Sequence, residues 1–173
     1  MTRTLVLVRH ARTEQGNAGG DHARELLPEG RREAAAAGRW LVQEVGAPGL
    51  ALVSSAVRAG QTWAGMADAG GLGEVEVWSD RRLYNAEPWV LLEAVREVPE
   101  AVSTVVLVAH SPGVPALAAG LADEEASDGA AFTRLRQGFG TSTCAVLEHE
   151  GDWADLGEGS ARLLTVASPR AQE

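Results

Sequence analysis

The sequence is poor in cysteine, lysine and long hydrophobic runs, and each shortage excludes a class of protein. Its one cysteine, Cys144, cannot form an internal disulfide bond, which excludes a disulfide-stapled extracellular domain. We interpret Cys144 as a small buried residue, because no second cysteine or paired histidine lies near it. No apolar run reaches the ~20 residues that a membrane-spanning helix needs. We therefore expect neither a signal peptide nor a membrane anchor and predict a cytoplasmic protein.

Positive charge is also scarce, and arginine carries all of it. The chain has 15 basic residues, none of them lysine, against 24 acidic residues, which gives a net charge of −9. Nucleic acids and anionic membranes bind to basic protein faces, so we expect neither as the main partner. A guanidinium group binds phosphate through two parallel hydrogen bonds, so a few arginines in one cleft could still select a phosphorylated ligand. Codon bias toward arginine is the alternative explanation.

The order of apolar and helical segments predicts the fold class. Short, continuously apolar runs, typical of strands buried on both faces of a parallel sheet, alternate with helical stretches. The expected strands cover 5–8, 50–53, 74–78 and 104–109, and the expected helices cover about 31–45, 57–69, 88–97 and 112–122. Two further strand-like runs, 143–148 and 162–167, predict a C-terminal β-hairpin. We predict a three-layer α/β/α sandwich with a mostly parallel central sheet, formed by a single domain over residues 1–173.

Histidine and arginine residues stand at the ends of the predicted strands. Arg9 and His10 follow the first strand, His110 follows the fourth, and Arg58 lies shortly after the second. In doubly wound sheets, ligands bind in the crevice beyond the carboxyl ends of the strands. One histidine in such a place is more often structural than catalytic, but two converge on one crevice if their strands are neighbours. The strand ends therefore predict a site that holds two histidines and two arginines.

Three segments, in this order, resemble the motifs of the histidine phosphatase superfamily. They are Leu-Val-Arg-His-Ala at 7–11, Ser-Ser-Ala-Val-Arg-Ala-Gly-Gln-Thr at 54–62 and Val-Ala-His-Ser-Pro-Gly at 108–113. Flanking segments at 21–26, 83–86, 153–156 and 159–163 are most similar to the SixA-type phosphohistidine phosphatases, so the resemblance spans nearly the whole chain. The chain departs from the usual motifs at Ala11 in place of glycine, Ala56 in place of proline and Ser111 in place of asparagine.

The resemblance implies a phosphoglycerate mutase-like fold and a phosphatase that carries the phosphoryl group transiently on His10. Arg9 and Arg58 would clamp the phosphate and hold down the pKa of His10, which must be neutral to attack. His110 would donate a hydrogen bond to a phosphate oxygen. This scheme uses no cofactor and no metal, and no carboxylate stands at metal-ligand spacing to either histidine.

Two other residues are weaker candidates. Arg24, in the loop before the first predicted helix, could bind substrate; an ion pair with Asp21 or Glu25 that anchors this loop is the alternative. Glu87, directly before Pro88, is by position the nearest candidate for the general acid that an alcohol leaving group needs. An ordinary carboxylate at the amino-terminal end of a helix, favoured by the helix dipole, is the alternative for Glu87.

Three functions remain open on the sequence alone. The first is a phosphatase for protein phosphohistidine, whose labile P–N bond depends less on a general acid. The second is a phosphatase of a small phosphate ester with Glu87 as the acid, and the third is a non-catalytic phosphate-binding module. A phosphoglycerate mutase is disfavoured because the chain lacks the length for the insertions that enclose its substrate. We expect a monomer, and we interpret His149 in the predicted hairpin as a solvated edge residue.

Overall fold

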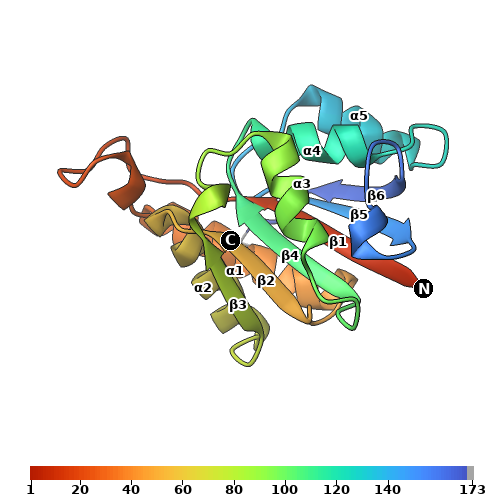
Figure 1. Cartoon of the computed structure of the whole chain (residues 1–173). Coiled ribbons are helices and arrows are strands. Elements are labelled where there is room, and N and C mark those ends of the chain that lie inside the picture. The colour runs from red at the N-terminus through yellow and green to blue at the C-terminus, as the bar shows by residue number, and fades with distance from the viewer. Residues whose placement is uncertain (171–173) are drawn as a thin grey trace.

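A six-stranded sheet forms the centre of residues 1–170, the part of the chain that the computed structural model describes (Figure 1). Its strands lie in the order β3-β2-β4-β1-β5-β6. Their bounds are β1 (Thr2–Arg9), β2 (Leu50–Ser54), β3 (Glu76–Asp80), β4 (Thr104–Ala109), β5 (Cys144–Glu150) and β6 (Ala161–Ala167). The first four strands pair in parallel, and β5 pairs antiparallel with both β1 and β6. The predicted mostly parallel sheet with a C-terminal hairpin is confirmed.

Helices cover both faces of this sheet and complete the predicted three-layer sandwich (Figure 1). Their bounds are α1 (Pro28–Glu44), α2 (Val57–Gly70), α3 (Pro88–Arg96), α4 (Gly113–Leu121) and α5 (Gly129–Gln137), with short 3-10 helices η1 (Asp21–Ala23), η2 (Arg81–Leu83) and η3 (Trp153–Asp155). Buried side chains of α1 and α2 pack on one face, and those of α3, α4 and α5 pack on the other. Within residues 1–170, no helix has the length and apolar character that crossing a membrane requires.

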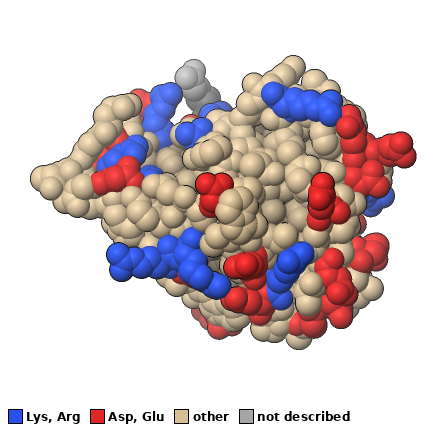
Figure 2. All heavy atoms as spheres, turned by 45° about the horizontal axis from the view of Figure 1, so that its top comes forward, with Lys and Arg blue, Asp and Glu red and all other residues tan. Residues whose placement is uncertain are grey.

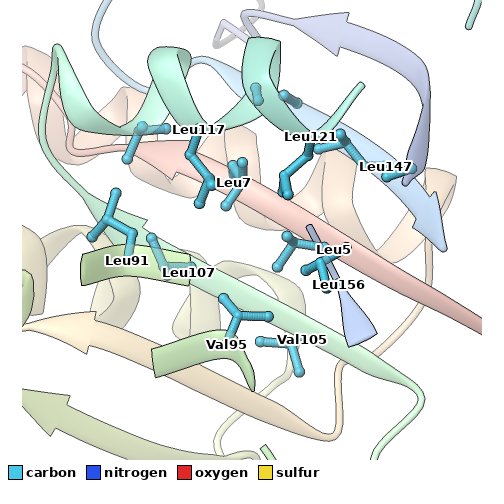
Figure 3. Close-up of a cluster of buried hydrophobic side chains, with 14 of the residues drawn as sticks. Leu5, Leu7, Leu91, Val95, Val105, Leu107, Leu117, Leu121, Leu147 and Leu156 are labelled. Atoms are coloured by element: carbon cyan, nitrogen blue, oxygen red, sulfur yellow. The ribbon is translucent and has the colours of Figure 1, made fainter. Parts of the chain in front are cut away.

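Burial on both faces explains why the central strands are continuously apolar. Along β1, Leu5 and Leu7 belong to the core on the α3–α5 side, whereas Val6 and Val8 belong to the core on the α1–α2 side. Successive side chains of a strand point to opposite faces, so a strand covered on both sides has no polar alternation. Figure 3 shows the side chains of β1 and β4 meeting those of α3 and α4 in the first of these cores.

Two elements differ from the sequence-based expectation. Helix α5 falls in a segment for which no helix was predicted, and its start depends on Asp128, whose carboxylate accepts a hydrogen bond from the amide of Ala131 at 2.9 Å. Strand β3 lies two residues later than expected. It is an edge strand with largely exposed side chains, so its apolar pattern is weak.

The interpretation of His149 as a solvated edge residue is wrong. Strand β5 lies inside the sheet, between β1 and β6, and the side chain of His149 is only 6% exposed. Its ring nitrogens face the carbonyl oxygens of Ser160 and Asp152, at 3.1 and 3.0 Å. A hairpin at the end of a chain suggests an exposed edge, but the sheet order places β6 outside β5.

Helices α1 and α2 approach each other so closely at Gly38 that no side chain fits there. A methyl group on Gly38 would lie 2.1 Å from the carbonyl oxygen of Met66. We predict that Gly38→Ala lowers the free energy of unfolding by about 1–3 kcal/mol, because the helices must separate. Gly60→Ala in α2, where nothing lies within 4 Å of the added methyl, should be neutral or slightly stabilising. Urea denaturation measures both, and equal stabilities of the two variants would contradict the close packing.

Candidate active site

The parallel pairing of β1 with β4 brings the two predicted histidines together. Arg9 pairs with Ala109, and the amide of His10 donates to the carbonyl oxygen of Ala109 at 3.0 Å. His10 and His110 therefore leave the sheet at the same level. Their ring centroids lie 5.2 Å apart, and their side chains are 8% and 4% exposed. The two strands are neighbours, which is the condition that the sequence analysis set for the histidines to converge.

A backbone hydrogen bond orients the ring of His10. Its Nδ1 lies 2.9 Å from the carbonyl oxygen of Ala11, so Nδ1 carries the proton and donates, and Nε2 keeps its lone pair. Burial, followed by the charges of Arg58 and Arg9, lowers the pKa of His10 to about 4, against the opposing effect of the hydrogen bond to Ala11. The ring is therefore neutral at physiological pH and has one unprotonated nitrogen.

Arg58 and Arg24 are held by the same acidic residue, Asp21. Arg58 lies in the first turn of α2 and donates from Nη1 to the backbone oxygen of Asp21 at 2.8 Å and from Nη2 to its carboxylate at 3.2 Å. Arg24 donates to the other carboxylate oxygen of Asp21 at 2.8 Å and to the hydroxyl of Thr13 at 2.6 Å. The loop-anchoring ion pair considered for Arg24 is thus present, with Asp21 rather than Glu25.

The remaining predicted arginine, Arg9, is fixed by the backbone of the loop before β5. Its Nη1 donates to the carbonyl oxygen of Phe139 at 3.0 Å, and burial lowers its pKa. Three buried nitrogen atoms of the predicted site residues have no hydrogen-bond partner within residues 1–170: Nε of Arg9, Nε of Arg58 and Nδ1 of His110. Unpaired buried polar groups are costly, so each is a candidate contact for a ligand.

Asp21 is an ionised carboxylate inside this cationic site. The hydroxyl of Tyr84 donates to it, and the guanidinium groups of Arg24 and Arg58 lie beside it. These contacts hold the pKa of the Asp21 carboxyl well below its usual range, and the carboxylate in turn raises the pKa of Tyr84. Asp21 therefore has no proton to give at physiological pH.

These side chains surround a cavity of about 430 Å³ beyond the carboxyl ends of the central strands. In Figure 1 the loop after β1 extends away from the body of the molecule at this end of the sheet. The cavity is lined by four arginines, both histidines and polar residues of the loops, namely Arg9, His10, Arg12, Thr13, Gln15, Asp21, Arg24, Arg58, Asn85, His110, Ser111 and Thr141. A larger cavity of about 740 Å³ is also lined by Arg9 and includes neither histidine. Of these two cavities in the described part of the chain, the smaller one holds both histidines together with four guanidinium groups.

The surface of the molecule carries charges of both signs. Figure 2 shows arginine and acidic side chains interleaved over one face of the molecule rather than a continuous basic surface. Four guanidinium groups nevertheless line one cavity of a chain whose net charge is −9. This arrangement suits a local phosphate site better than a long polyanion.

The structure does not bring Glu87 into this cavity. Glu87 is exposed at the start of α3, makes no side-chain capping bond and is not among the lining residues. Sequence reasoning missed Tyr84, which contacts Asp21, and Asn85, which lines the wall. Asn85 has a φ of 48°, a left-handed conformation that asparagine tolerates better than most residues. The resemblance of segment 83–86 to SixA-type proteins marked this turn in the sequence but assigned no role to either residue.

A known family model matches the part of the chain that carries the first two motifs. Residues 5–100 match the model of the histidine phosphatase superfamily (branch 1). The chain belongs to this superfamily. It is 37% identical over 163 residues to uncharacterized protein Rv1276c of Mycobacterium tuberculosis, a match that covers 94% of this chain and 100% of that protein.

Solved structures extend this relationship from sequence to fold. A candidate phosphohistidine phosphatase SixA from Nakamurella multipartitia is 37% identical, with a TM-score of 0.86 over 99% of this chain and 98% of that chain. A second candidate SixA, from Agrobacterium tumefaciens, is 27% identical, with a TM-score of 0.77 over 96% of this chain and 98% of that chain. The predicted phosphoglycerate mutase-like histidine phosphatase fold and its similarity to SixA-type proteins are confirmed.

The neutral state of His10 makes the stability of the folded chain depend on pH. The pKa of His10 is about 4 in the folded chain, against about 6.5 in an unfolded chain, so between these values only the unfolded chain binds the proton. We predict that the free energy of unfolding decreases as the pH falls from 6.5 to 4, with His10 contributing on the order of 3 kcal/mol. Urea denaturation at several pH values measures this decrease. His10→Gln cannot titrate and should show a smaller decrease; equal slopes would mean that the fold does not hold His10 neutral.

Proposed function

We propose that this protein is a metal-independent phosphatase that forms a covalent phosphohistidine intermediate on His10 and acts on phosphohistidine in a protein. The observation that carries the proposal is the state of His10. The ring is buried and neutral, and the bond to Ala11 leaves the lone pair on Nε2. A neutral imidazole nitrogen beside guanidinium groups combines a nucleophile with the charges that a phosphoryl group requires.

The first chemical step transfers the phosphoryl group from the substrate to the enzyme. Nε2 of His10 forms a bond to phosphorus while the bond from phosphorus to the leaving nitrogen breaks, and the leaving nitrogen keeps the electron pair. Arg9, Arg58 and Arg24 neutralise the charge on the equatorial oxygens, and His110 donates a hydrogen bond to one of them. The unpaired Nε atoms of Arg9 and Arg58 and Nδ1 of His110 supply donors for these contacts.

The second step restores the enzyme. A water molecule attacks phosphorus on phospho-His10, and its oxygen and both hydrogens pass to the departing phosphate. The P–N electron pair returns to Nε2, while Nδ1 keeps its proton and its bond to Ala11. Positive charge at the phosphate comes from the guanidinium groups, so the scheme assigns no role to a metal ion.

The acid–base groups of the cavity favour a phosphohistidine substrate over an ester. Asp21 is the one carboxyl group among the lining residues of the described chain, and it is ionised. Glu87 is exposed and lies outside the lining. An alkoxide leaving group needs a proton from a general acid, whereas a phosphoimidazole with a proton on its second nitrogen leaves as a neutral ring. The Nakamurella and Agrobacterium proteins carry the name of phosphohistidine phosphatases, which supports the same substrate class.

The other expectations from the sequence stay predictions. They are a single domain over residues 1–173, a monomeric and cytoplasmic protein, and substrate binding by Arg24 in addition to its contact with Asp21. Arg24 lines the cavity, which supports the last of these.

The covalent intermediate can be detected directly. With a phosphohistidine peptide labelled in its phosphoryl group, rapid quenching should trap acid-labile, base-stable label on the peptide that contains His10. His10→Ala should lose the label and at least about 10³-fold in kcat, whereas His110→Gln should slow turnover but keep the nucleophile and so still accept label. A chelator such as EDTA should leave the rate unchanged. The proposal would be refuted if His10→Ala still became labelled. It would also be refuted if the wild-type protein bound phosphate but never became labelled.

Substrate preference tests the assignment of the leaving group. We predict a higher kcat/KM for a phosphohistidine peptide than for p-nitrophenyl phosphate, and a change of less than about twofold on both substrates in Glu87→Gln. Steady-state kinetics on the two substrates, with wild-type protein and Glu87→Gln, measure this preference. The ester phosphatase would be the correct function if the ester were preferred and if Glu87→Gln removed that activity.

A further inference from the structure

Ser54, the last residue of β2, contacts His110 without lining the cavity. Its side chain is 1% exposed, and its Oγ lies 2.7 Å from Nε2 of His110. Ser54 is not among the residues that line the cavity. It therefore acts on a ligand only through His110, and the inference that follows rests on the proposed phosphatase function.

A second contact to Ser54 favours one direction for this hydrogen bond. The backbone amide of Ala56 donates to Oγ of Ser54 at 3.3 Å. A hydroxyl has one hydrogen to give and two lone pairs to accept with. Within residues 1–170, the Ser54 hydroxyl has one other recorded partner, Nε2 of His110. Its hydrogen is therefore satisfied only if Nε2 accepts it.

Counting unpaired groups favours the same direction. If Ser54 donates to Nε2, the ring proton of His110 sits on Nδ1, and one buried donor lacks a partner. If instead Nε2 donates to Ser54, both the serine hydrogen and the lone pair on Nδ1 lack partners. Burial, followed by the charges of Arg58 and His10, lowers the pKa of His110 to about 3, so the ring is neutral and has a single proton to place. Each unpaired buried group costs free energy, so the arrangement with one is favoured.

The backbone amide of Ala56 supplies a hydrogen bond to Ser54 that the usual motif residue could not supply. The motif that residues 54–62 resemble usually has proline at this position, and proline has no amide hydrogen. Ala56 supplies the hydrogen that occupies one lone pair of Ser54. The departure at residue 56 therefore adds a donor behind the site.

We propose that Ser54 is a positioning residue that fixes His110 in the tautomer with its proton on Nδ1. In that tautomer a neutral His110 can donate from Nδ1 to a phosphoryl oxygen in both steps of the reaction. In the other tautomer Nδ1 has a lone pair, which repels an anionic oxygen. His110 then acts as a hydrogen-bond donor and not as an imidazolium acid.

Nitrogen-15 NMR of the histidine rings at pH 7 tests the proposal on the wild-type protein, without any assay. Nδ1 of His110 should carry the proton and Nε2 should not, and inorganic phosphate should shift the Nδ1 signal. A proton on Nε2 in the wild-type protein would overturn the proposal. That result would leave the proposed phosphatase function standing, because the NMR measurement does not depend on turnover. Conversely, a protein without phosphatase activity whose His110 carries its proton on Nδ1 would refute only the proposed function.

Two serine variants separate positioning from a general loss of structure. Ser54→Ala should redistribute the ring proton of His110 and lower kcat by roughly 10-fold, less than the about 10²–10³-fold typical of removing a donor outright. Ser54→Thr keeps the hydroxyl and should restore the wild-type tautomer. Ser55→Ala is the matched control, because the neighbouring hydroxyl contacts the exposed His22 at 3.0 Å and should leave His110 unchanged. An unchanged His110 tautomer in Ser54→Ala would also overturn the proposal.

Discussion

The parallel register between β1 and β4 is the constraint on which the rest of the site depends. Because Arg9 lies opposite Ala109, the next residues, His10 and His110, leave the sheet together. Arg58 reaches the same place because β2 pairs with the other side of β4 and α2 begins three residues after β2 ends. A slip of one residue would turn one histidine to the opposite face of the sheet. Backbone pairing alone therefore brings His10, His110 and Arg58 to the same end of the sheet.

The second constraint is electrostatic, since two buried imidazoles share a small volume with four guanidinium groups. Both rings are neutral, because burial, followed by the charges of neighbouring arginines, lowers the pKa of His10 to about 4 and that of His110 to about 3. Asp21 holds Arg58 and Arg24 in place, and the backbone oxygen of Phe139 holds Arg9. The arginines surround the neutral rings with positive charge, which suits phosphoryl transfer by positioning and charge stabilisation.

Hydrogen bonds to the rings add a further level of organisation. His10 donates from Nδ1 to Ala11, and the proposed bond from Ser54 gives His110 its proton on the same ring atom. The two neighbouring rings then differ in function, because one offers a lone pair and the other a donor. Neither assignment depends on a charged partner, in contrast to Arg58 and Arg24, which donate to the carboxylate of Asp21.

Sequence patterns predicted most accurately the strands whose burial is complete; they placed the edge strand β3 two residues too early and did not predict α5. The runs that became β1, β2 and β4 are apolar on both faces, so their identity, and the histidines and arginine that follow them, could be inferred. Strand β3 and helix α5 are largely exposed, so their patterns are weak. Position alone suggested Glu87 as the general acid, but as the N-cap residue of α3 it has its side chain in solvent.

The sequence by itself determined the family, the α/β/α sandwich and the identity of the two histidines and two arginines, because these depend on local motifs and on apolar periodicity. Only the tertiary structure decided that Asp21 and Tyr84 contact the arginine side of the site, that His149 is buried and that Ser54 lies behind His110. The contacts of Asp21 with Arg58 and Tyr84 join residues 37 and 63 positions apart, and Ser54 and His110 are separated by 56 positions. No local pattern encodes such contacts, because they arise from strand order and from the packing of loops against it.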